Sequence, residues 1–299
     1  MKKRNEVRWI AMLLILPVLA AGCAAPANDA SGGTTTAVPH VTAASAVTTR
    51  TTTATTTAST TAAPTTAAPT TTQVPTTTTT EENVEELSYY EALEGKTFVV
   101  FGDSTVYGHT LGVQNTWSAL LAEKYGMNYQ NKGLNGNGVL INNSSNSAML
   151  PMYQRYTALP DDVDILFVMG GTNDYYKKAP LGTTSDTEAT TFAGALNVLI
   201  EGLKEKYPNT LILFSTPYYK NEQQKQYCDM VQSVCTLQGV PCFYAADKEA
   251  TGIRQDEADF RAEYQMSASD TDHLNRKGME LVMPVFEAYI GQQYTDYIG

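Results

Sequence analysis

The sequence has little basic charge, few histidines and only one long apolar run, and each shortage excludes a class of function. Its 299 residues include 20 Lys and Arg against 31 Asp and Glu, and only three histidines. This acidic excess argues against binding to nucleic acid or to anionic lipid head groups. After residues 9–21, no apolar run is long enough to predict a membrane-spanning helix.

Cysteine is also scarce, and Cys228, Cys235 and Cys242 are the three that follow residue 86. Cys228 and Cys235 lie seven residues apart in a helical pattern, which separates them by about 10 Å along the axis, beyond disulfide reach. A bond from either of them to Cys242 remains open. Because three is odd, at least one thiol should stay free. The spacing matches no zinc site.

The first residues have the pattern of an export signal. Basic residues at positions 2–8 precede the apolar run at 9–21, which is too short to span a bilayer stably. Residues 19–23, Leu-Ala-Ala-Gly-Cys, resemble the cleavage site of a bacterial lipoprotein. The resemblance implies a signal peptide over 1–22 and a lipid-modified Cys23. It also implies an extracellular location, anchored to the cell membrane of a bacterium that we expect to be Gram-positive. The alternative is an ordinary secretory signal with an incidental cysteine.

Residues 23–86 consist largely of Thr, Ala and Pro. Such a segment cannot bury enough apolar surface to offset its ordering entropy, so we expect a disordered linker. A flexible coil of about 60 residues has an end-to-end distance on the order of 40–45 Å, which suits a stalk. The remaining residues, 87–299, are the right length for one α/β domain. We expect this domain to be a monomer, attached to the membrane only through the lipid.

Five apolar runs in residues 87–299 predict β-strands, and helical patterns lie between them. The predicted strands are 97–102, 127–131, 163–170, 210–216 and 240–245. The predicted helices are 117–125, 188–207, 222–238 and a last one that follows Asn275, an expected N-cap. Alternating strands and helices imply a parallel sheet covered on both faces. Two long irregular stretches, 132–160 and 246–272, have a length typical of functional loops.

A serine follows the first predicted strand directly, at Gly102-Asp103-Ser104. Ligands of open parallel sheets bind beyond the carboxyl ends of the strands, so Ser104 is placed to react. A serine nucleophile needs a base that is oriented by a third group. His273, with Asp270 three residues before it, can supply both. An alternative interpretation is a solvated acidic loop with a capping histidine, and a rarer one is a metal site made of Asp270, Asp272 and His273.

Two other turns follow neighbouring strands. Asn173 lies after the third strand in Gly-Gly-Thr-Asn-Asp, where its amide can donate to an oxyanion. The stretch 131–137 after the second strand contains Gly133 and Gly136, and glycines let backbone N–H groups approach a ligand closely. Each pattern alone also suits an ordinary turn. Of the two other histidines, His40 lies in the linker and His109 is expected at the rim of the site.

These motifs together resemble the SGNH (GDSL-type) hydrolase family, over nearly all of 95–292. The resemblance implies a three-layer α/β/α sandwich with a five-stranded parallel sheet of flavodoxin-like type. It implies a catalytic triad of Ser104, Asp270 and His273. It also implies an oxyanion hole formed by Ser104, Gly136 and Asn173, and an acyl-enzyme intermediate. No metal or organic cofactor is implied.

The predicted function is therefore a serine esterase that acts on short acyl esters. For a stalked extracellular esterase, the expected substrate is an O-acetylated polysaccharide or a smaller ester. Five tyrosines lie near the predicted site, and aromatic rings can stack on sugars. These are Tyr107, Tyr175, Tyr176, Tyr218 and Tyr219. The alternatives are a broad short-chain esterase or lysophospholipase, and a non-catalytic surface binding module on the same fold.

Overall fold

The computed structural model describes Tyr89 and residues 91–299. The predicted signal peptide (1–22), the predicted lipid attachment at Cys23 and the predicted linker (23–86) lie outside the described residues and stay predictions. Within the described part of the chain, no helix is both long and apolar enough to cross a bilayer.

A five-stranded parallel sheet forms the centre of the described residues. Its strands are β1 (Thr97–Gly102), β2 (Asn128–Gly133), β3 (Ile165–Met169), β4 (Leu211–Ser215) and β5 (Cys242–Phe243). They lie in the order β2-β1-β3-β4-β5, and every neighbouring pair is parallel. The predicted fold class is confirmed. The last strand is shorter than expected at both ends. Pro241 has no N–H to donate at its start, and after Phe243 the chain turns, with the Ala245 N–H donating to the backbone oxygen of Phe243.

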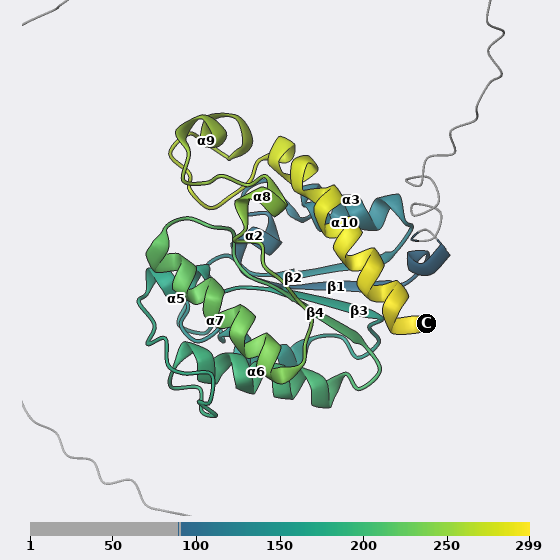
Figure 1. Ribbon diagram of the computed structural model, residues 1–299, viewed down its shortest axis with the longest axis horizontal. Helices are drawn as coiled ribbons and strands as arrows, with labels where there is room; N and C mark the ends of the chain where they lie inside the picture. Colours follow the sequence, from purple (N-terminus) through teal and green to yellow (C-terminus); the bar gives the residue numbers. More distant parts are fainter. Residues whose placement is uncertain (1–88, 90) are drawn as a thin grey trace, which may run out of the picture. The chain divides into compact units, whose positions relative to one another are not determined.

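Four long helices cover the two faces of this sheet (Figure 1). The helices α3 (Trp117–Lys124) and α10 (Arg276–Ile298) lie on one face. The helices α6 (Phe192–Lys206) and α7 (Glu222–Gln238) lie on the other. All four begin after an N-cap whose side chain accepts a backbone N–H, and these caps are Thr116, Asn275, Thr191 and Asn221.

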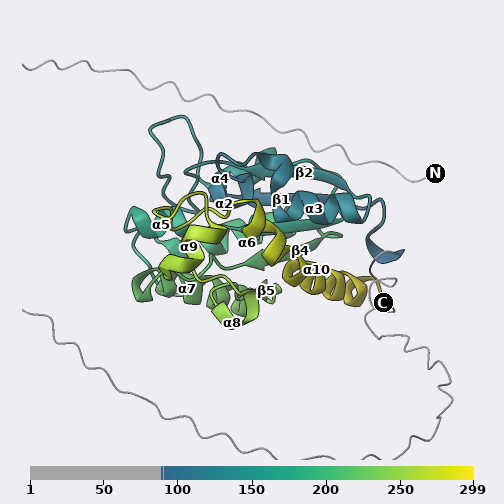
Figure 2. The ribbon, with the colours of Figure 1, turned by 90° about the horizontal axis from the view of Figure 1, so that it is seen from above.

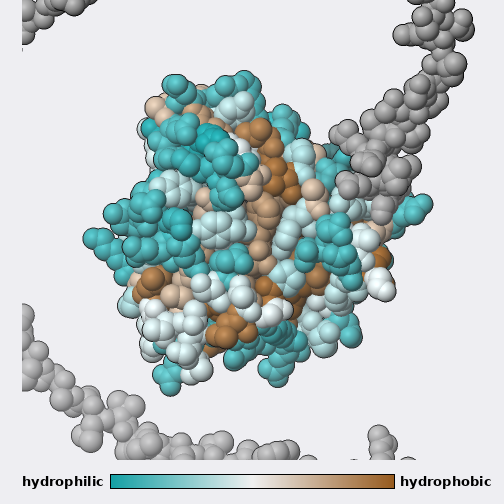
Figure 3. Space-filling model, viewed as in Figure 1, coloured by the Kyte–Doolittle hydropathy of each residue, from teal (hydrophilic) through white to brown (hydrophobic). Residues whose placement is uncertain are grey.

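The sheet separates two hydrophobic cores, and the alternation of side chains along β1 shows why. Phe98 and Val100 are buried against α3 and α10, whereas Val99 and Phe101 are buried on the side of α6 and α7. A central strand of a parallel sheet is buried on both faces, so its sequence is apolar throughout. The outer surface is mostly hydrophilic on the face drawn in Figure 3, with smaller hydrophobic patches between the polar residues.

The two stretches predicted to be irregular contain several short helices. These are α4 (Met152–Arg155), η2 (Tyr156–Ala158), α8 (Lys248–Thr251) and α9 (Ala258–Tyr264). Three more lie close behind strands or between helices: α2 (Ser104–Tyr107), η1 (Val113–Asn115) and α5 (Thr172–Tyr176). Segments of three to seven residues are too short to show helical periodicity, which needs a window of about 11–18 residues. Figure 2 shows the short helices α2, α5 and α9 near one end of the sheet.

The carboxyl end of β1 requires a glycine. A Cβ on Gly102 would lie 2.1 Å from the backbone oxygen of Met169 on β3, which no side chain can tolerate. The absence of a side chain lets β1 and β3 stay paired up to the point where Asp103 and Ser104 begin.

The three cysteines of the described residues are free thiols. The sequence leaves open a pairing of Cys242 with either Cys228 or Cys235. In the structure the thiol of Cys235 lies next to that of Cys242, and the two are not joined by a disulfide. The hydrogen bond with Cys242, together with burial, raises the pKa of Cys235.

Candidate active site

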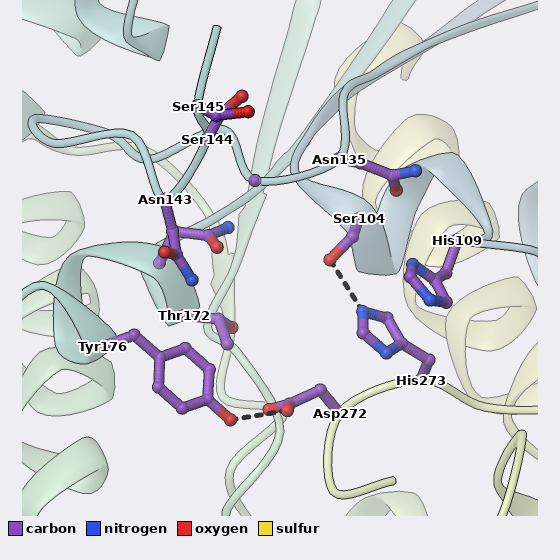
Figure 4. A pocket seen from close by; sticks show the side chains of 12 residues that line it. Ser104, His109, Asn135, Asn143, Ser144, Ser145, Thr172, Tyr176, Asp272 and His273 are labelled. Carbon is purple, nitrogen blue, oxygen red and sulfur yellow. Dashed lines mark hydrogen bonds between the residues drawn. The ribbon is translucent and has the colours of Figure 1, made fainter.

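Ser104 is the first residue of α2, directly after the carboxyl end of β1. The side chain of Asp103 caps this helix by accepting the Thr105 N–H at 2.9 Å and the Thr105 hydroxyl at 2.7 Å. The turn therefore fixes the backbone of Ser104 and leaves its hydroxyl directed toward the loops at this end of the sheet (Figure 4).

His273 lies in the loop between α9 and α10, and it meets Ser104 across 169 residues of sequence. Its Nε2 is 2.9 Å from Ser104 Oγ, the contact dashed in Figure 4. Its Nδ1 is 3.0 Å from Oδ2 of Asp270. An antiparallel bridge between Gln265 and Leu274 closes this loop at its base. The structure thus brings together the three residues that the sequence predicts as a triad.

Asp270 is held as a charged carboxylate. Burial alone would raise its pKa, but the backbone N–H groups of Asp272 and His273 donate to Oδ1 at 2.9 and 3.0 Å. These bonds and the nearby imidazole outweigh burial and lower the pKa of Asp270 below its usual value. A negative Asp270 favours the tautomer in which Nδ1 of His273 carries the proton and Nε2 faces Ser104 as an acceptor.

Gly136 and Asn173 line the pocket beside Ser104, as the sequence predicts. One N–H of the buried Asn173 amide donates to the backbone oxygen of Asn137 at 3.0 Å. An amide NH₂ has two donors, so this bond orients Asn173 and leaves a second hydrogen for a ligand. Gly133 instead allows the backbone of β2 to pack closely against α2, because a Cβ there would lie 2.4 Å from the Tyr107 nitrogen.

A half-buried arginine, Arg155, supports this side of the pocket. The guanidinium of Arg155 donates to the backbone oxygens of Lys132 and Gly102 at 2.8 and 3.1 Å, and to Asn137 Oδ1 at 2.9 Å. Burial lowers the pKa of Arg155 to about 10. The arginine therefore joins the ends of β1 and β2 to Asn137, the residue that orients Asn173.

A buried carboxylate holds the loop after β2. Asp174 follows Asn173 on α5 and accepts the backbone N–H groups of Val139, Leu140 and Ile141 at 2.7–2.9 Å. Burial raises the pKa of Asp174 to about 6 despite these three donors. The loop that carries Gly136 is thereby attached to the helix that carries Asn173.

The opposite wall of the pocket is an ion pair capped by a tyrosine. Lys220 Nζ is 2.9 Å from Oδ1 of Asp272, with both side chains largely buried. The hydroxyl of Tyr176 donates to Asp272 Oδ2 at 2.5 Å, the second dashed contact in Figure 4, and Lys220 also contacts this hydroxyl. This cluster links α5 to the loop that carries Asp270 and His273.

The pocket has a volume of about 490 Å³, and nearly all of its lining residues are polar. Besides the residues already described, it is lined by His109, Asn135, Asn143, Ser144, Ser145 and Thr172. Of the tyrosines predicted to contact substrate, Tyr176 belongs to this lining. Tyr107 is half-buried beside Gly133, and Tyr175 accepts the Asn221 side-chain N–H at 3.0 Å. Within the described residues, no group of three or more His, Cys, Asp and Glu side chains is arranged to hold a metal ion.

The sequence does not indicate the stacking of His109. Its ring lies against the ring of His273, with the centroids 3.9 Å apart. No periodicity or motif points to this contact, because it depends on how the turn after α2 meets the loop before α10. The roles of Arg155 and Lys220 were missed for the same reason.

An α/β/α sandwich with hydrogen-bonded serine, histidine and aspartate side chains at the carboxyl end of its strands has the architecture of a hydrolase. The family model described as GDSL-like lipase/acylhydrolase matches residues 100–281. The chain therefore belongs to this family, the GDSL-type or SGNH hydrolases, whose fold and esterase chemistry the sequence motifs predict.

Solved structures share the fold. A protein from Lactobacillus plantarum has a TM-score of 0.58 and 24% identity, over 67% of this chain and 98% of its own. Proteins described as GDSL-like lipases from Bacteroides ovatus and Bacteroides uniformis have TM-scores of 0.51 and 0.50 and identities of 18% and 20%. They cover 67% and 66% of this chain, and 100% and 96% of their own. None of the curated proteins matches the chain.

Proposed function

We propose that the protein is an extracellular, lipid-anchored serine esterase that hydrolyses short acyl esters, above all O-acetyl groups on carbohydrate. The observation that carries the catalytic part is the continuous chain of contacts from Ser104 through His273 to Asp270, which opens on a polar pocket. The sequence motifs for export and lipidation support the location.

In the proposed reaction, His273 Nε2 takes the proton of Ser104 as its Oγ attacks the ester carbonyl. Asp270 stays ionised, accepts the hydrogen bond from the Nδ1–H group of His273 and stabilises the imidazolium that forms. The same proton then passes to the leaving alcohol. Water hydrolyses the acyl-enzyme through the same base and releases the acid.

The negative oxygen of the tetrahedral intermediate would lie among three donors. These are the backbone N–H groups of Ser104 and Gly136 and the free hydrogen of the Asn173 amide. Donors held in position before the reaction stabilise developing charge most strongly, and loss of one typically costs about 3–4 kcal/mol of barrier. The bonds from Arg155 to Asn137 and from Asn173 to Asn137 provide this prior orientation.

The pocket lining supports a hydroxylated acceptor. Amide and hydroxyl side chains from Asn135, Asn143, Ser144 and Ser145 line the pocket that contains Ser104, and such groups match sugar hydroxyls better than an acyl chain. A second hollow of about 490 Å³ shares Tyr176 with this pocket. We name it the α5–α7 groove, and its lining consists of Tyr175, Tyr176, Lys178, Gln223, Gln226 and Tyr227. Aromatic faces with nearby amides favour a neighbouring sugar unit.

The test is hydrolysis of p-nitrophenyl acetate, p-nitrophenyl butyrate and acetylated xylan by the full chain. We expect activity on p-nitrophenyl acetate and on acetylated xylan. The Ser104→Ala substitution should lower kcat about a thousandfold or more. Ser233→Ala, at an exposed serine of α7, is the matched control and should remain active. Equal rates for Ser104→Ala and the unmodified protein would refute the nucleophile. Activity on the p-nitrophenyl esters without acetate release from xylan would favour the broad short-chain esterase.

A further inference from the structure

The ring of His109 lies flat against the ring of His273, the proposed base. The rings of His109 and His273 are stacked with their centroids 3.9 Å apart and their planes at 14° (Figure 4). Both residues line the pocket at Ser104. Nothing in the proposed reaction requires this second imidazole, so its position calls for its own explanation.

The chain places His109 in a backbone conformation that its side chain disfavours. The helix α2 ends at Gly108 with φ +85°, and His109 follows with φ +44°. The N–H groups of both residues donate to the backbone oxygen of Ser104 at 3.0 Å. Among the described non-glycine residues, Lys178 is the other one with positive φ, and its side chain is exposed. Glycine would fit the position of His109 with less strain.

The side chain of His109 is also unfavourable in itself. Its Nδ1 is buried and has no hydrogen-bond partner in the described part of the protein. Burial of an unpaired polar atom destabilises a fold. A strained backbone and an unpaired buried nitrogen both lower stability, and such features are found mainly at functional sites. His109 is therefore better explained by a role in the site than by a role in stability.

The geometry of His273 shows what the stacked ring adds. Its two contacts, Nε2 to Ser104 and Nδ1 to Asp270, both lie at the edges of the imidazole. The ring can turn about its Cβ–Cγ bond, and such a turn would move Nε2 away from Ser104 and Nδ1 away from Asp270 together. A flat group against one face prevents it.

We propose that His109 is a positioning residue that fixes the ring plane of His273 for proton transfer from Ser104. The inference rests on the proposed function, in which His273 is the base. The stacked ring acts through His273 and not on the substrate, so its loss should lower kcat and leave KM nearly unchanged.

The experiment compares His109→Gly, His109→Asn and His109→Phe in the full chain with p-nitrophenyl acetate. Gly and Asn suit positive φ but remove the ring, whereas Phe keeps a flat ring at a strained position. We expect kcat to fall about ten- to a hundredfold in the Gly and Asn variants. The Phe variant should keep a kcat close to that of the unmodified protein. Thermal unfolding should give the opposite ranking, with His109→Gly at least as stable as the unmodified protein.

The opposite rankings distinguish a positioning role from a structural one. Unchanged kcat in folded His109→Gly and His109→Asn would overturn the inference, and so would a Phe variant as slow as the Gly variant. Ser104→Ala in the same assay tests the proposed function separately. If it stays active, the reaction does not depend on the Ser104–His273 pair. If it is inactive while His109→Gly is fully active, the proposed function stands and the role of His109 is refuted.

Discussion

At the residue scale, Asp103 combines a structural role with an electrostatic penalty. It caps α2 through Thr105, yet its side chain is almost fully buried and its Oδ2 has no partner among the described residues. Burial raises its pKa from 3.8 to about 6. The cap therefore holds Ser104 in place while the ionised carboxylate destabilises the fold.

The substitution Asp103→Asn should remove a pH dependence of stability. Because the folded-state pKa is raised, the stabilising effect of the protonated carboxyl is complete below about pH 4. It is lost as the pH rises through about 6, by an amount on the order of 3 kcal/mol. Asn stays neutral and its Oδ1 can still accept from Thr105. The free energy of unfolding of the variant should thus rise relative to the unmodified protein between pH 4 and pH 7.

Urea unfolding at several pH values measures this difference. Taking the difference between the two proteins at each pH removes the titration of all other groups, including Asp174, whose pKa is also raised to about 6. The unpaired amide of Asn adds an offset that does not vary with pH. A difference that stays constant from pH 4 to pH 7 would contradict the raised pKa of Asp103.

At the scale of elements, α5 shows how one short helix serves several surfaces. Successive residues on a helix are turned by about 100°, so Asn173, Asp174 and Tyr176 point to different neighbours. Asn173 lines the pocket, Asp174 holds the loop after β2, and Tyr176 contacts Asp272. Tyr175 and Tyr176 also line the α5–α7 groove.

The groove yields a prediction about substrate size. The exposed amides of Gln223 and Gln226 on α7 face a neighbouring sugar unit in the proposed function. The double variant Gln223→Ala with Gln226→Ala should raise KM for acetylated xylan about tenfold, since each hydrogen bond contributes about 0.5–1.5 kcal/mol. The values for p-nitrophenyl acetate should not change, because it is too small to reach the groove.

The matched control lies on a different helix. Gln292→Ala with Gln293→Ala, near the end of α10 (Figure 1), removes the same chemical groups and should leave both substrates unaffected. An equal rise of KM for xylan in both double variants would argue against a sugar subsite in the groove.

The sequence predicts the long elements and the residues that follow them. Ser104 and Asn173 could be found because each comes directly after an apolar strand, and parallel strands bring their carboxyl ends to one edge. His273 and Asp270 could be found because they form a local motif before a helix. His109, Arg155 and Lys220 could not be found. Their contacts depend on the paths of loops that have no periodic signal.

At the scale of the whole molecule, an aromatic cluster connects α10 to the rest of the core. Phe286 is fully buried and stacks on Trp117 of α3, with ring centroids 4.2 Å apart. It also meets the edges of Phe167 on β3 and Phe243 on β5, at 5.3 and 5.4 Å. The helix that follows His273 is thus anchored by one side chain to three other elements.

Removal of this side chain should destabilise the whole domain. We expect Phe286→Ala to lower the free energy of unfolding by about 3–5 kcal/mol, because it leaves a cavity at the centre of the cluster. Leu281→Ala on the same helix is the control, since Leu281 is 38% exposed and should change stability by about 1 kcal/mol or less. Equal losses in urea unfolding would show that the position on α10, and not the cluster, decides the effect.

The distance along the chain between Ser104 and His273 has a consequence for timing. The serine is synthesised 169 residues before the histidine, and α10, which anchors the histidine loop, is made after both. A polypeptide that ends before His273 lacks the base, whatever the state of its sheet. We therefore expect esterase activity only from chains that extend through the loop that carries His273. In the proposed function, export of the unfolded chain would keep this activity away from esters inside the cell.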